Sequence, residues 1–196
     1  MAGDATGDRA GDAGRRRPGR FRRVVAGVAL TTTLLLACLV VAALVLGVRV
    51  DGASMTPALR DGDRVLVNPL GDGPRRLDVV VARHTDGGPR VVKRVIALGG
   101  DQVRITGAVV EVRPGGVGEW RPVRNPAWTG RWSRPAAPLE LTVPAGAVFL
   151  LGDNPDGSED SRTLGPAPAR LVQGTVVLRI WPPADAGRPQ PLQQDG

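Results

Sequence analysis

Apolar positions along this 196-residue chain follow two different patterns. From Val24 to Val48 they form one uncharged run, VVAGVALTTTLLLACLVVAALVLGV. At 1.5 Å of rise per residue, a helix of this length spans about 37 Å, which exceeds the roughly 30 Å of a bilayer's hydrocarbon core. The run therefore predicts a transmembrane helix over residues 24–48.

After this run the apolar positions occur in short, Val-rich stretches that are separated by Gly, Asp and Pro turns, a pattern typical of strands. We find no soluble amphipathic helix and no internal repeat. Residues 49–181 are therefore predicted to be all-β, and the Pro- and Gln-rich residues 182–196 are predicted to be disordered. The expected strands are 64–68, 78–83, 90–98, 102–106, 109–113, 139–143, 148–151 and 174–181.

One stretch of the all-β part has a different composition. Pro, Gly and Arg dominate residues 114–138, which predicts an inserted loop or small lobe over about residues 107–147. Two interpretations of its tryptophans stay open: contact with the membrane interface, where indoles are favoured, or a small core of the insertion. The tryptophans are Trp120, Trp128 and Trp132.

The charge distribution orients the predicted helix. Residues 1–23 contain seven Arg and three Asp, a net charge of +4, and the rest of the chain carries only +3 of the total +7. The positive-inside rule keeps this basic tail cytoplasmic and places everything after residue 48 outside. No basic patch with interleaved aromatic residues occurs, so nucleic-acid binding is not expected.

Two alternatives to an uncleaved anchor fit the sequence less well. A signal peptide has an apolar core of about 7–15 residues, and the run over 24–48 is longer. Leu35-Leu36-Ala37-Cys38 weakly resembles a lipoprotein cleavage site, but the apolar run continues well past Cys38. The sequence favours a retained helix in which Cys38 is a small apolar residue.

The counts of reactive side chains exclude several chemistries. The chain has one His (His84), one Cys and, among its 26 basic residues, a single Lys (Lys93). One Cys forms no intrachain disulfide, and one His with one Cys cannot build a His/Cys zinc site. A Ser-His-Asp triad would depend on His84 alone and is not expected.

Lys93 occupies a predicted strand among valines. Alternation places it on one face with Val91 and Val95, while Arg94 points to the other. A solvated strand lysine is one interpretation. The other is a need for a neutral amine, because a buried Lys can lose its proton whereas Arg stays charged.

Ser54 lies six residues beyond Val48, a link that reaches about 20 Å when fully extended, so the residue stays close to the membrane. In isolation, a Ser before Met-Thr-Pro reads as an ordinary turn serine.

Residues 152–165 form a polar segment with four acidic side chains, which could be a plain loop. The segment lacks the EF-hand ligand spacing, so a calcium loop is not expected.

Five boxes, taken in order, resemble those of the bacterial type I signal peptidases, the Ser/Lys-dyad leader peptidases. The resemblance covers nearly all of residues 49–181. The boxes are Ser-Met-x-Pro (54–57), Gly-Asp-x-Val-Leu-Val (62–67), Asp-Val-Val-Val (78–81), Lys-Arg-Val-x-x-x-x-Gly-Asp (93–101) and Gly-Asp-Asn-x-x-x-Ser-x-Asp-Ser-Arg-x-x-Gly (152–165).

The resemblance implies that Ser54 is the nucleophile and Lys93 the general base. A hydroxyl needs a neighbouring base to become nucleophilic. Lysine serves only if burial lowers its pKa from about 10.4, and three units of depression correspond to about 4 kcal/mol. Supporting roles are implied for Ser158, which would hydrogen-bond the lysine, for the ion pairs Asp160–Arg162 and Asp153–Arg94, and for Met55, which would line the substrate pocket.

One position departs from the family pattern. Some members have a hydroxyl residue two positions before the nucleophile that donates to the oxyanion, and here this residue is Gly52. The oxyanion hole would then depend on backbone N–H groups, with that of Ser54 the first candidate.

The resemblance further implies coiled antiparallel sheets of barrel-like form and a membrane-anchored serine endopeptidase. It would cleave signal peptides from exported preproteins after a small residue, with no cofactor or metal, and its partners would be preproteins and the lipid bilayer. Two alternatives stay open: a related Ser/Lys peptidase for a dedicated substrate, and an inactive membrane-tethered binding module.

Overall fold

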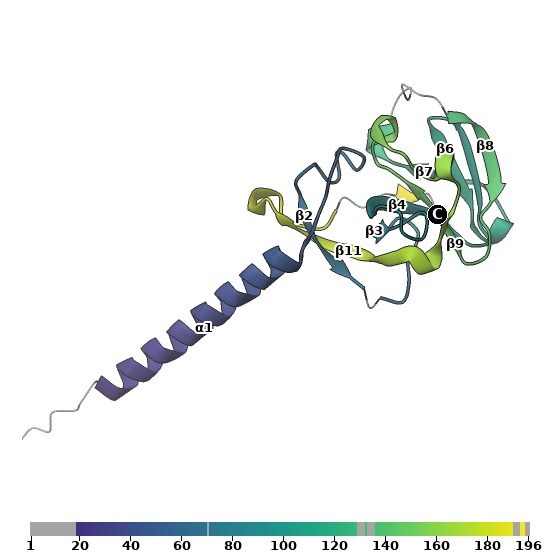
Figure 1. Cartoon of the computed structure of the whole chain (residues 1–196). Helices are drawn as coiled ribbons and strands as arrows, with labels where there is room; N and C mark the ends of the chain where they lie inside the picture. Colours follow the sequence, from purple (N-terminus) through teal and green to yellow (C-terminus); the bar gives the residue numbers. More distant parts are fainter. Residues whose placement is uncertain (1–18, 70, 129–131, 133–135, 190–192, 195–196) are drawn as a thin grey trace, which may run out of the picture. The chain divides into compact units, whose positions relative to one another are not determined.

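The computed structural model describes residues 19–69, 71–128, 132, 136–189 and 193–194 (Figure 1). The chain divides into two compact units, Met1–Val41 and Ala42–Gly196. Helix α1, Gly19–Leu46, begins ahead of the predicted start at residue 24. Arginine is a good helix former, so the basic flank extends the helix at little cost.

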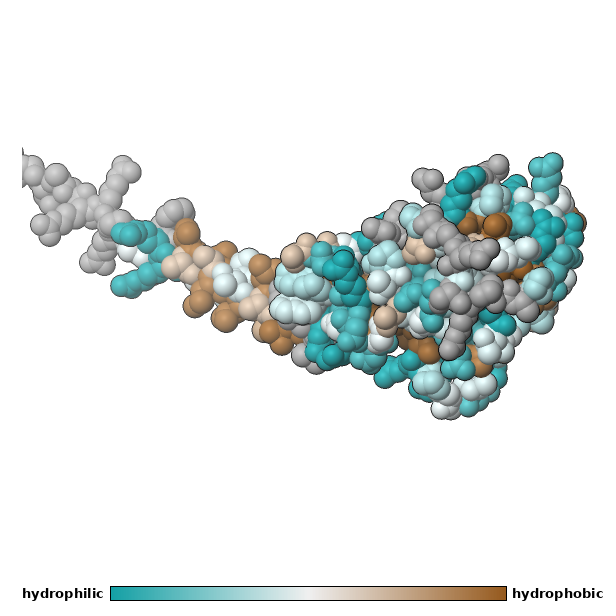
Figure 2. Space-filling view, turned by 90° about the horizontal axis from the view of Figure 1, so that it is seen from above, coloured by the Kyte–Doolittle hydropathy of each residue, from teal (hydrophilic) through white to brown (hydrophobic). Residues whose placement is uncertain are grey.

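Helix α1 presents its apolar side chains outward. In Figure 2 brown, hydrophobic residues cover it, and Leu35 is 64% exposed. Its segment Arg22–Leu39 is long and apolar enough to cross a membrane. An apolar helix without a protein partner for its surface has the character of a membrane span.

The second unit is built from short strands, which confirms the all-β prediction. All eight expected strands are present, two with the predicted bounds and six with ends that differ by at most three residues. The strands of the larger sheet are β1 (Val48–Arg49), β2 (Arg64–Asn68), β3 (Val79–Ala82), β4 (Val91–Leu98), β9 (Ala147–Leu151), β10 (Ala167–Pro168) and β11 (Val172–Trp181). Those of the smaller sheet are β5 (Gln102–Gly107), β6 (Val109–Arg113), β7 (Arg121–Arg124), β8 (Ala136–Thr142) and β12 (Gln193–Gln194).

Both sheets are antiparallel among the described residues. The larger has the order β1-β2-β11-β3-β4-β9-β10, and the smaller has the order β12-β7-β6-β5-β8. Register shifts interrupt the pairing of β11 with both of its neighbours and of β4 with β9. Such bulges increase local twist, and they accompany the curling of the larger sheet in Figure 1.

Two apolar clusters determine where the site lies. One packs Met55 and Leu59 against buried valines of β2, β3 and β11. The other packs the smaller sheet against residues of β4 and β9 and includes Trp128 and Trp132. The burial of these two indoles favours the small-core interpretation of the insertion. The proposed bounds of the insertion at about 107–147 stay a prediction.

Residues 182–196, predicted to be disordered, contain secondary structure in their described part. A 3-10 turn, Pro183–Asp185, follows β11, and β12 pairs with β7. Backbone N–H and C=O groups of an edge strand favour such pairing, and composition alone does not reveal it.

Candidate active site

Ser54 is positioned by a turn that rests on the apolar core. Met55 and Leu59 have no exposed surface, and the Leu59 N–H donates to the Met55 carbonyl at 2.9 Å. Ser54, immediately before this pair, is half-buried and lines a cavity of about 910 Å³. The buried pair thus fixes the backbone on which the serine is presented.

Met55 itself is in the core. It packs with Val65 and Val79 and has no exposed surface. The residues that line the cavity do not include it. A contact between Met55 and a substrate side chain stays a prediction, and the structure gives this residue a packing role beneath Ser54.

Gly52 has no side-chain hydroxyl to donate to an oxyanion, and its backbone N–H is already engaged. Its φ of +86° is one that L side chains rarely adopt, and its N–H donates to Asp61 Oδ1 at 2.8 Å. That donor is therefore occupied. The Ser54 N–H has no hydrogen-bond partner among the residues that the structure describes, which leaves it available for an oxyanion.

Lys93 lies in the middle of the larger sheet and opens onto the same cavity as Ser54. Its strand, β4, runs between β3 and β9, where Lys93 is opposite Val80. The residue is only 3% exposed. Within the described ranges its ammonium group has neither a hydrogen bond nor an ion pair, so nothing compensates directly for its burial.

This burial lowers the pKa of Lys93 below its ordinary value. The carboxylates of Asp160 and Glu159 act in the opposite direction, and the Arg162 guanidinium acts in the same direction as burial. The lysine is thereby shifted towards the neutral amine that a general base requires.

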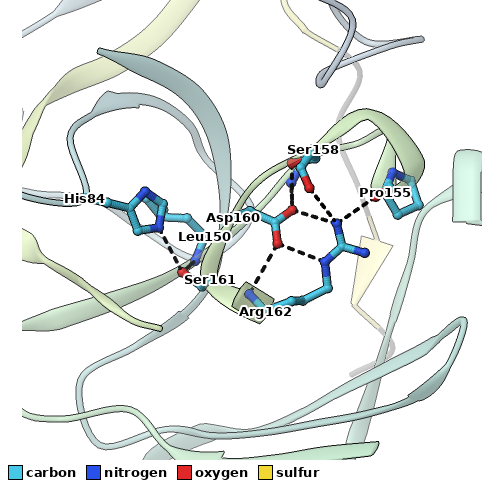
Figure 3. A network of polar contacts seen from close by, with 8 residues as sticks. His84, Leu150, Pro155, Ser158, Asp160, Ser161 and Arg162 are labelled. Atoms are coloured by element: carbon cyan, nitrogen blue, oxygen red, sulfur yellow. Dashed lines mark hydrogen bonds and ion pairs between the residues drawn. The ribbon is translucent and has the colours of Figure 1, made fainter. Parts of the chain in front are cut away.

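A carboxylate, Asp160, organises the loop whose polar contacts Figure 3 shows. It has no exposed surface and accepts hydrogen bonds from Gly152 N at 3.0 Å and Ser158 Oγ at 2.7 Å. The Arg162 guanidinium binds both of its oxygens, at 2.8 and 3.0 Å, and also reaches the Pro155 carbonyl at 2.8 Å. The Asp160–Arg162 pair therefore holds the loop together through hydrogen bonds to other residues of the same loop.

The Ser158 hydroxyl donates its hydrogen bond to Asp160, whereas the resemblance implies a hydrogen bond between Ser158 and Lys93. No bond between Ser158 and Lys93 occurs in the described part of the chain. A carboxylate is the stronger acceptor, so it takes the single hydroxyl proton. The lone pairs of Ser158 Oγ remain able to accept from the lysine.

His84 is a cavity residue that the sequence did not assign to the site. Its Nε2 lies 3.4 Å from Ser161 Oγ, which accepts from Leu150 N at 2.9 Å (Figure 3). Burial lowers the pKa of His84, and the nearby Lys93 contributes in the same direction against the carboxylate of Asp160. A neutral imidazole is therefore favoured at neutral pH.

A second ion pair joins β4 to the same loop from the other side. Arg94 and Asp153, each with a side chain only 2% exposed, form a two-pronged pair at 2.8 and 2.6 Å. The Arg94 guanidinium also donates to the Leu77 carbonyl at 2.8 Å, and Asn125 Nδ2 donates to Asp153 at 3.1 Å. Two adjacent residues of β4 thus have different roles: Lys93 lines the cavity, and Arg94 forms with Asp153 a buried clamp between β4 and the loop.

Two of the four acidic residues of this loop are paired with arginines. Asp153 is paired with Arg94, and Asp160 with Arg162. Among the described residues, no group of three or more His, Cys, Asp or Glu side chains is arranged to hold a metal ion.

Asn154 connects the loop to the Ser54 turn, a role that the sequence analysis missed. Its backbone N–H donates to the Ser54 carbonyl at 2.9 Å, and its side-chain amide donates to the Ala53 carbonyl at 3.1 Å. The available signal was its place in the Gly-Asp-Asn box. Its partners are about 100 residues away in the chain, which no local pattern reveals.

Gly152 leaves no room for a side chain between the Ser54 turn and Ser158. A Cβ there would lie 2.4 Å from Ser158 Oγ and 2.5 Å from the Ser54 carbonyl oxygen. We expect Gly152→Ala to push these segments apart, at the 1–3 kcal/mol typical of overpacking, and to lower turnover by about tenfold or more. Turnover of a peptide substrate measures this.

The matched control for Gly152→Ala is Gly71→Ala. A Cβ at Gly71 would meet only Asn68 Nδ2, at 3.8 Å, an ordinary van der Waals contact. Its activity should equal that of the unmodified chain. Full activity of Gly152→Ala would show that the two segments tolerate separation and that their close approach is not needed.

Comparison with known proteins adds independent information. The family model described as "Signal peptidase, peptidase S26" matches residues 23–181. Signal peptidase I of Bacillus caldolyticus is 37% identical over 142 residues, which cover 68% of this chain and 78% of that protein. Signal peptidase IB of Staphylococcus aureus is 33% identical, over 68% of this chain and 76% of that protein. Mitochondrial inner membrane protease subunit 1 of Xenopus tropicalis is 34% identical, over 67% and 66% respectively.

Proposed function

This chain belongs to the S26 family, the signal peptidases, and is a hydrolase of that family, and on this premise we propose that it cleaves preproteins with a Ser54/Lys93 dyad. The family assignment supports a membrane signal peptidase that acts on preproteins bearing signal peptides. The proposal adds the catalytic groups, the cleavage position and the orientation in the membrane.

The observation that carries the proposal is a buried lysine without a counter-ion in the same cavity as a serine. Lys93 is 3% exposed, and the cavity brings it together with Ser54 from a segment about 40 residues earlier. A purely structural lysine would be paired or would extend into solvent. An uncompensated buried amine is instead suited to exchange a proton with a substrate-facing hydroxyl.

In the acylation step the neutral Lys93 amine takes the proton of the Ser54 hydroxyl as its oxygen attacks the scissile carbonyl carbon. The carbonyl oxygen becomes an oxyanion, which the Ser54 N–H is placed to stabilise. The Lys93 ammonium then returns the proton to the leaving amine, and an ester remains on Ser54. Ser158, whose proton is held by Asp160, presents lone pairs that orient the lysine.

In the deacylation step Lys93 acts again as the base. It takes one proton from a water molecule that attacks the ester, and it returns this proton to the Ser54 oxygen as the ester bond breaks. The product leaves as a carboxylic acid, which releases the second proton of the water to solvent. The enzyme returns to its starting protonation state, so one lysine serves both half-reactions.

The proposed orientation places the basic tail in the cytoplasm and the β unit on the other side of the membrane. The positive-inside rule supports this direction, and α1 is long enough to cross. Signal peptides carry a small-residue cleavage site just after their apolar segment. A nucleophile only a few residues beyond an anchor is tethered near the depth of that site.

The full chain in phospholipid vesicles is expected to cut preproteins after a small residue. Replacing the alanine before the cut with phenylalanine should lower kcat/KM by about 100-fold or more, because a pocket for a small side chain excludes the ring. N-terminal sequencing of the mature product and the rate ratio of the two preproteins measure this.

A panel of unrelated preproteins separates the alternatives. A general signal peptidase should process several of them, whereas a peptidase with a dedicated substrate should process one. An inactive tethered module should process none. Equal rates for the alanine and phenylalanine preproteins would contradict the proposed specificity.

A further inference from the structure

The Trp-bearing insertion contacts the loop of residues 152–165, which lies beside the candidate catalytic residues and takes part in both buried ion pairs. Trp128 and Trp132 are each 5% exposed and pack edge to face, with ring centroids 6.2 Å apart at 75°. Their place in the apolar cluster between the smaller sheet and strands β4 and β9 anchors the segment that carries them. From this anchored position the insertion reaches the loop at two points.

The first contact is between Trp132 and Arg162. The guanidinium carbon of Arg162 lies 4.9 Å from the centroid of the indole ring, within the range of a cation–π interaction. The same guanidinium binds both oxygens of Asp160. Its side chain is 10% exposed, so the indole is part of what shields the ion pair from water.

The second contact is between Asn125 and Asp153. Asn125 Nδ2 donates to Asp153 Oδ1 at 3.1 Å, and the side chain is fixed in turn, since Asn125 Oδ1 accepts from Ala127 N at 2.9 Å. One short segment of the insertion therefore touches both ion pairs of the loop, the one with Arg94 and the one with Arg162.

The pairing of Asp160 matters for Lys93. The charged and titratable groups that act on the lysine are Asp160, Glu159, Arg162 and, across the cavity, His84. Its strand partner in β3 is Val80, which carries no charge. As long as Arg162 stays on Asp160, its positive charge offsets part of the attraction of the carboxylate for the Lys93 ammonium. If Arg162 moves away, the free carboxylate attracts the ammonium form of Lys93.

We propose that Trp132 is a positioning residue for the reaction: its indole holds Arg162 on Asp160 and so keeps the carboxylate from binding the Lys93 ammonium. The insertion is then a brace for the loop of residues 152–165. This inference rests on the proposed function of Lys93 as the base, but its consequence for the lysine can be measured without any substrate.

The chain offers an unusually direct measurement, since Lys93 is its only lysine. Full-length protein labelled with ¹⁵N at the lysine Nζ gives one side-chain amine signal, whose shift against pH reports the Lys93 pKa. In Trp132→Leu we expect this pKa to rise by about half a unit or more, with a threefold loss of kcat at the acid limb of the pH profile.

Two further variants define the aromatic contribution. Trp132→Phe keeps an aromatic face over Arg162 and should stay close to the unmodified chain, because the Trp132 Nε1 has no hydrogen-bond partner among the described residues. If Trp132→Leu gives too little folded protein, Trp132→Met, which lacks an aromatic face but fills the space better, carries the same expectation.

The matched control is Trp120→Leu. Trp120 also stacks on arginines, with its ring centroid 4.4 Å from Arg104 and 4.8 Å from Arg113, but these arginines belong to β5 and β6 of the smaller sheet. Its Lys93 titration and pH profile should be unchanged. Identical titrations of Trp132→Leu and Trp120→Leu would overturn the inference even if Trp132→Leu melts earlier. An unmodified chain without peptidase activity would instead contradict the proposed function and leave the titration as the test of the brace.

Discussion

Replacing Lys93 with arginine is expected to lower kcat by about 10³-fold or more, although the positive charge is retained. The proposed mechanism needs a neutral amine, and arginine does not lose its proton in proteins. Ser54→Ala should abolish turnover to a similar extent, because it removes the attacking oxygen. The measurement is single-turnover cleavage of a preprotein by the full chain in detergent.

A companion variant, Lys93→Met, separates chemistry from folding. It should be as inactive as Lys93→Arg but more stable than the unmodified chain near neutral pH, since it removes a buried amine that has no partner. Lys93→Arg should be less stable, because it buries a charge that cannot be neutralised. Thermal unfolding of the three proteins gives this order.

The pH dependence of stability supplies an independent readout. The pKa of Lys93 is lowered in the folded state, so between that pKa and the ordinary value of 10.5 the unfolded chain binds more protons. The lysine's contribution therefore makes the folded state more stable as pH rises through this window. Lys93→Met should lose that slope, and Ser54→Ala should keep it. Substantial cleavage by Lys93→Arg would exclude the lysine as the base.

The strands could be predicted because their determinants are local. Runs such as Arg64–Asn68 and Val109–Arg113 alternate or concentrate valines between turn residues, and both have the bounds that the pattern predicts. Strand β7, Arg121–Arg124, was missed because it contains a proline and two arginines, and its place depends on pairing with β6. The two-residue strands are too short for any periodicity.

The same distinction between local and non-local determinants applies to the candidate site. Ser54 and Lys93 could be selected because each is chemically distinctive in its own box, and a single lysine among arginines is visible in the composition. The contacts of Asn154 with Ala53 and of Trp132 with Arg162 join segments that no local pattern relates. Packing and sheet curvature determine these contacts, so they emerge only from the folded chain.

The largest expected loss of stability comes from breaking the buried clamp between Arg94 and Asp153. Arg94→Met should reduce the free energy of unfolding by about 3–5 kcal/mol, because it leaves a carboxylate that is 2% exposed without its cation. It also removes the donor to the carbonyl of Leu77, a residue held at a φ of +73°. Chemical denaturation of the full chain in detergent measures the loss.

The double variant Arg94→Met/Asp153→Asn determines whether the clamp is stabilising or merely costly to break. With both charges gone and Asn125 still able to donate to the new amide, most of the lost stability should return, since a buried pair is weak evidence for stability. Arg170→Met provides the control, because its partner Asp86 forms an exposed pair that solvent screens and its midpoint of unfolding should hardly change. Equal destabilisation by the single and double variants would mean that the pair contributes net stability to the junction of β4 with the loop of residues 152–165, and the uncompensated carboxylate would not be the cause.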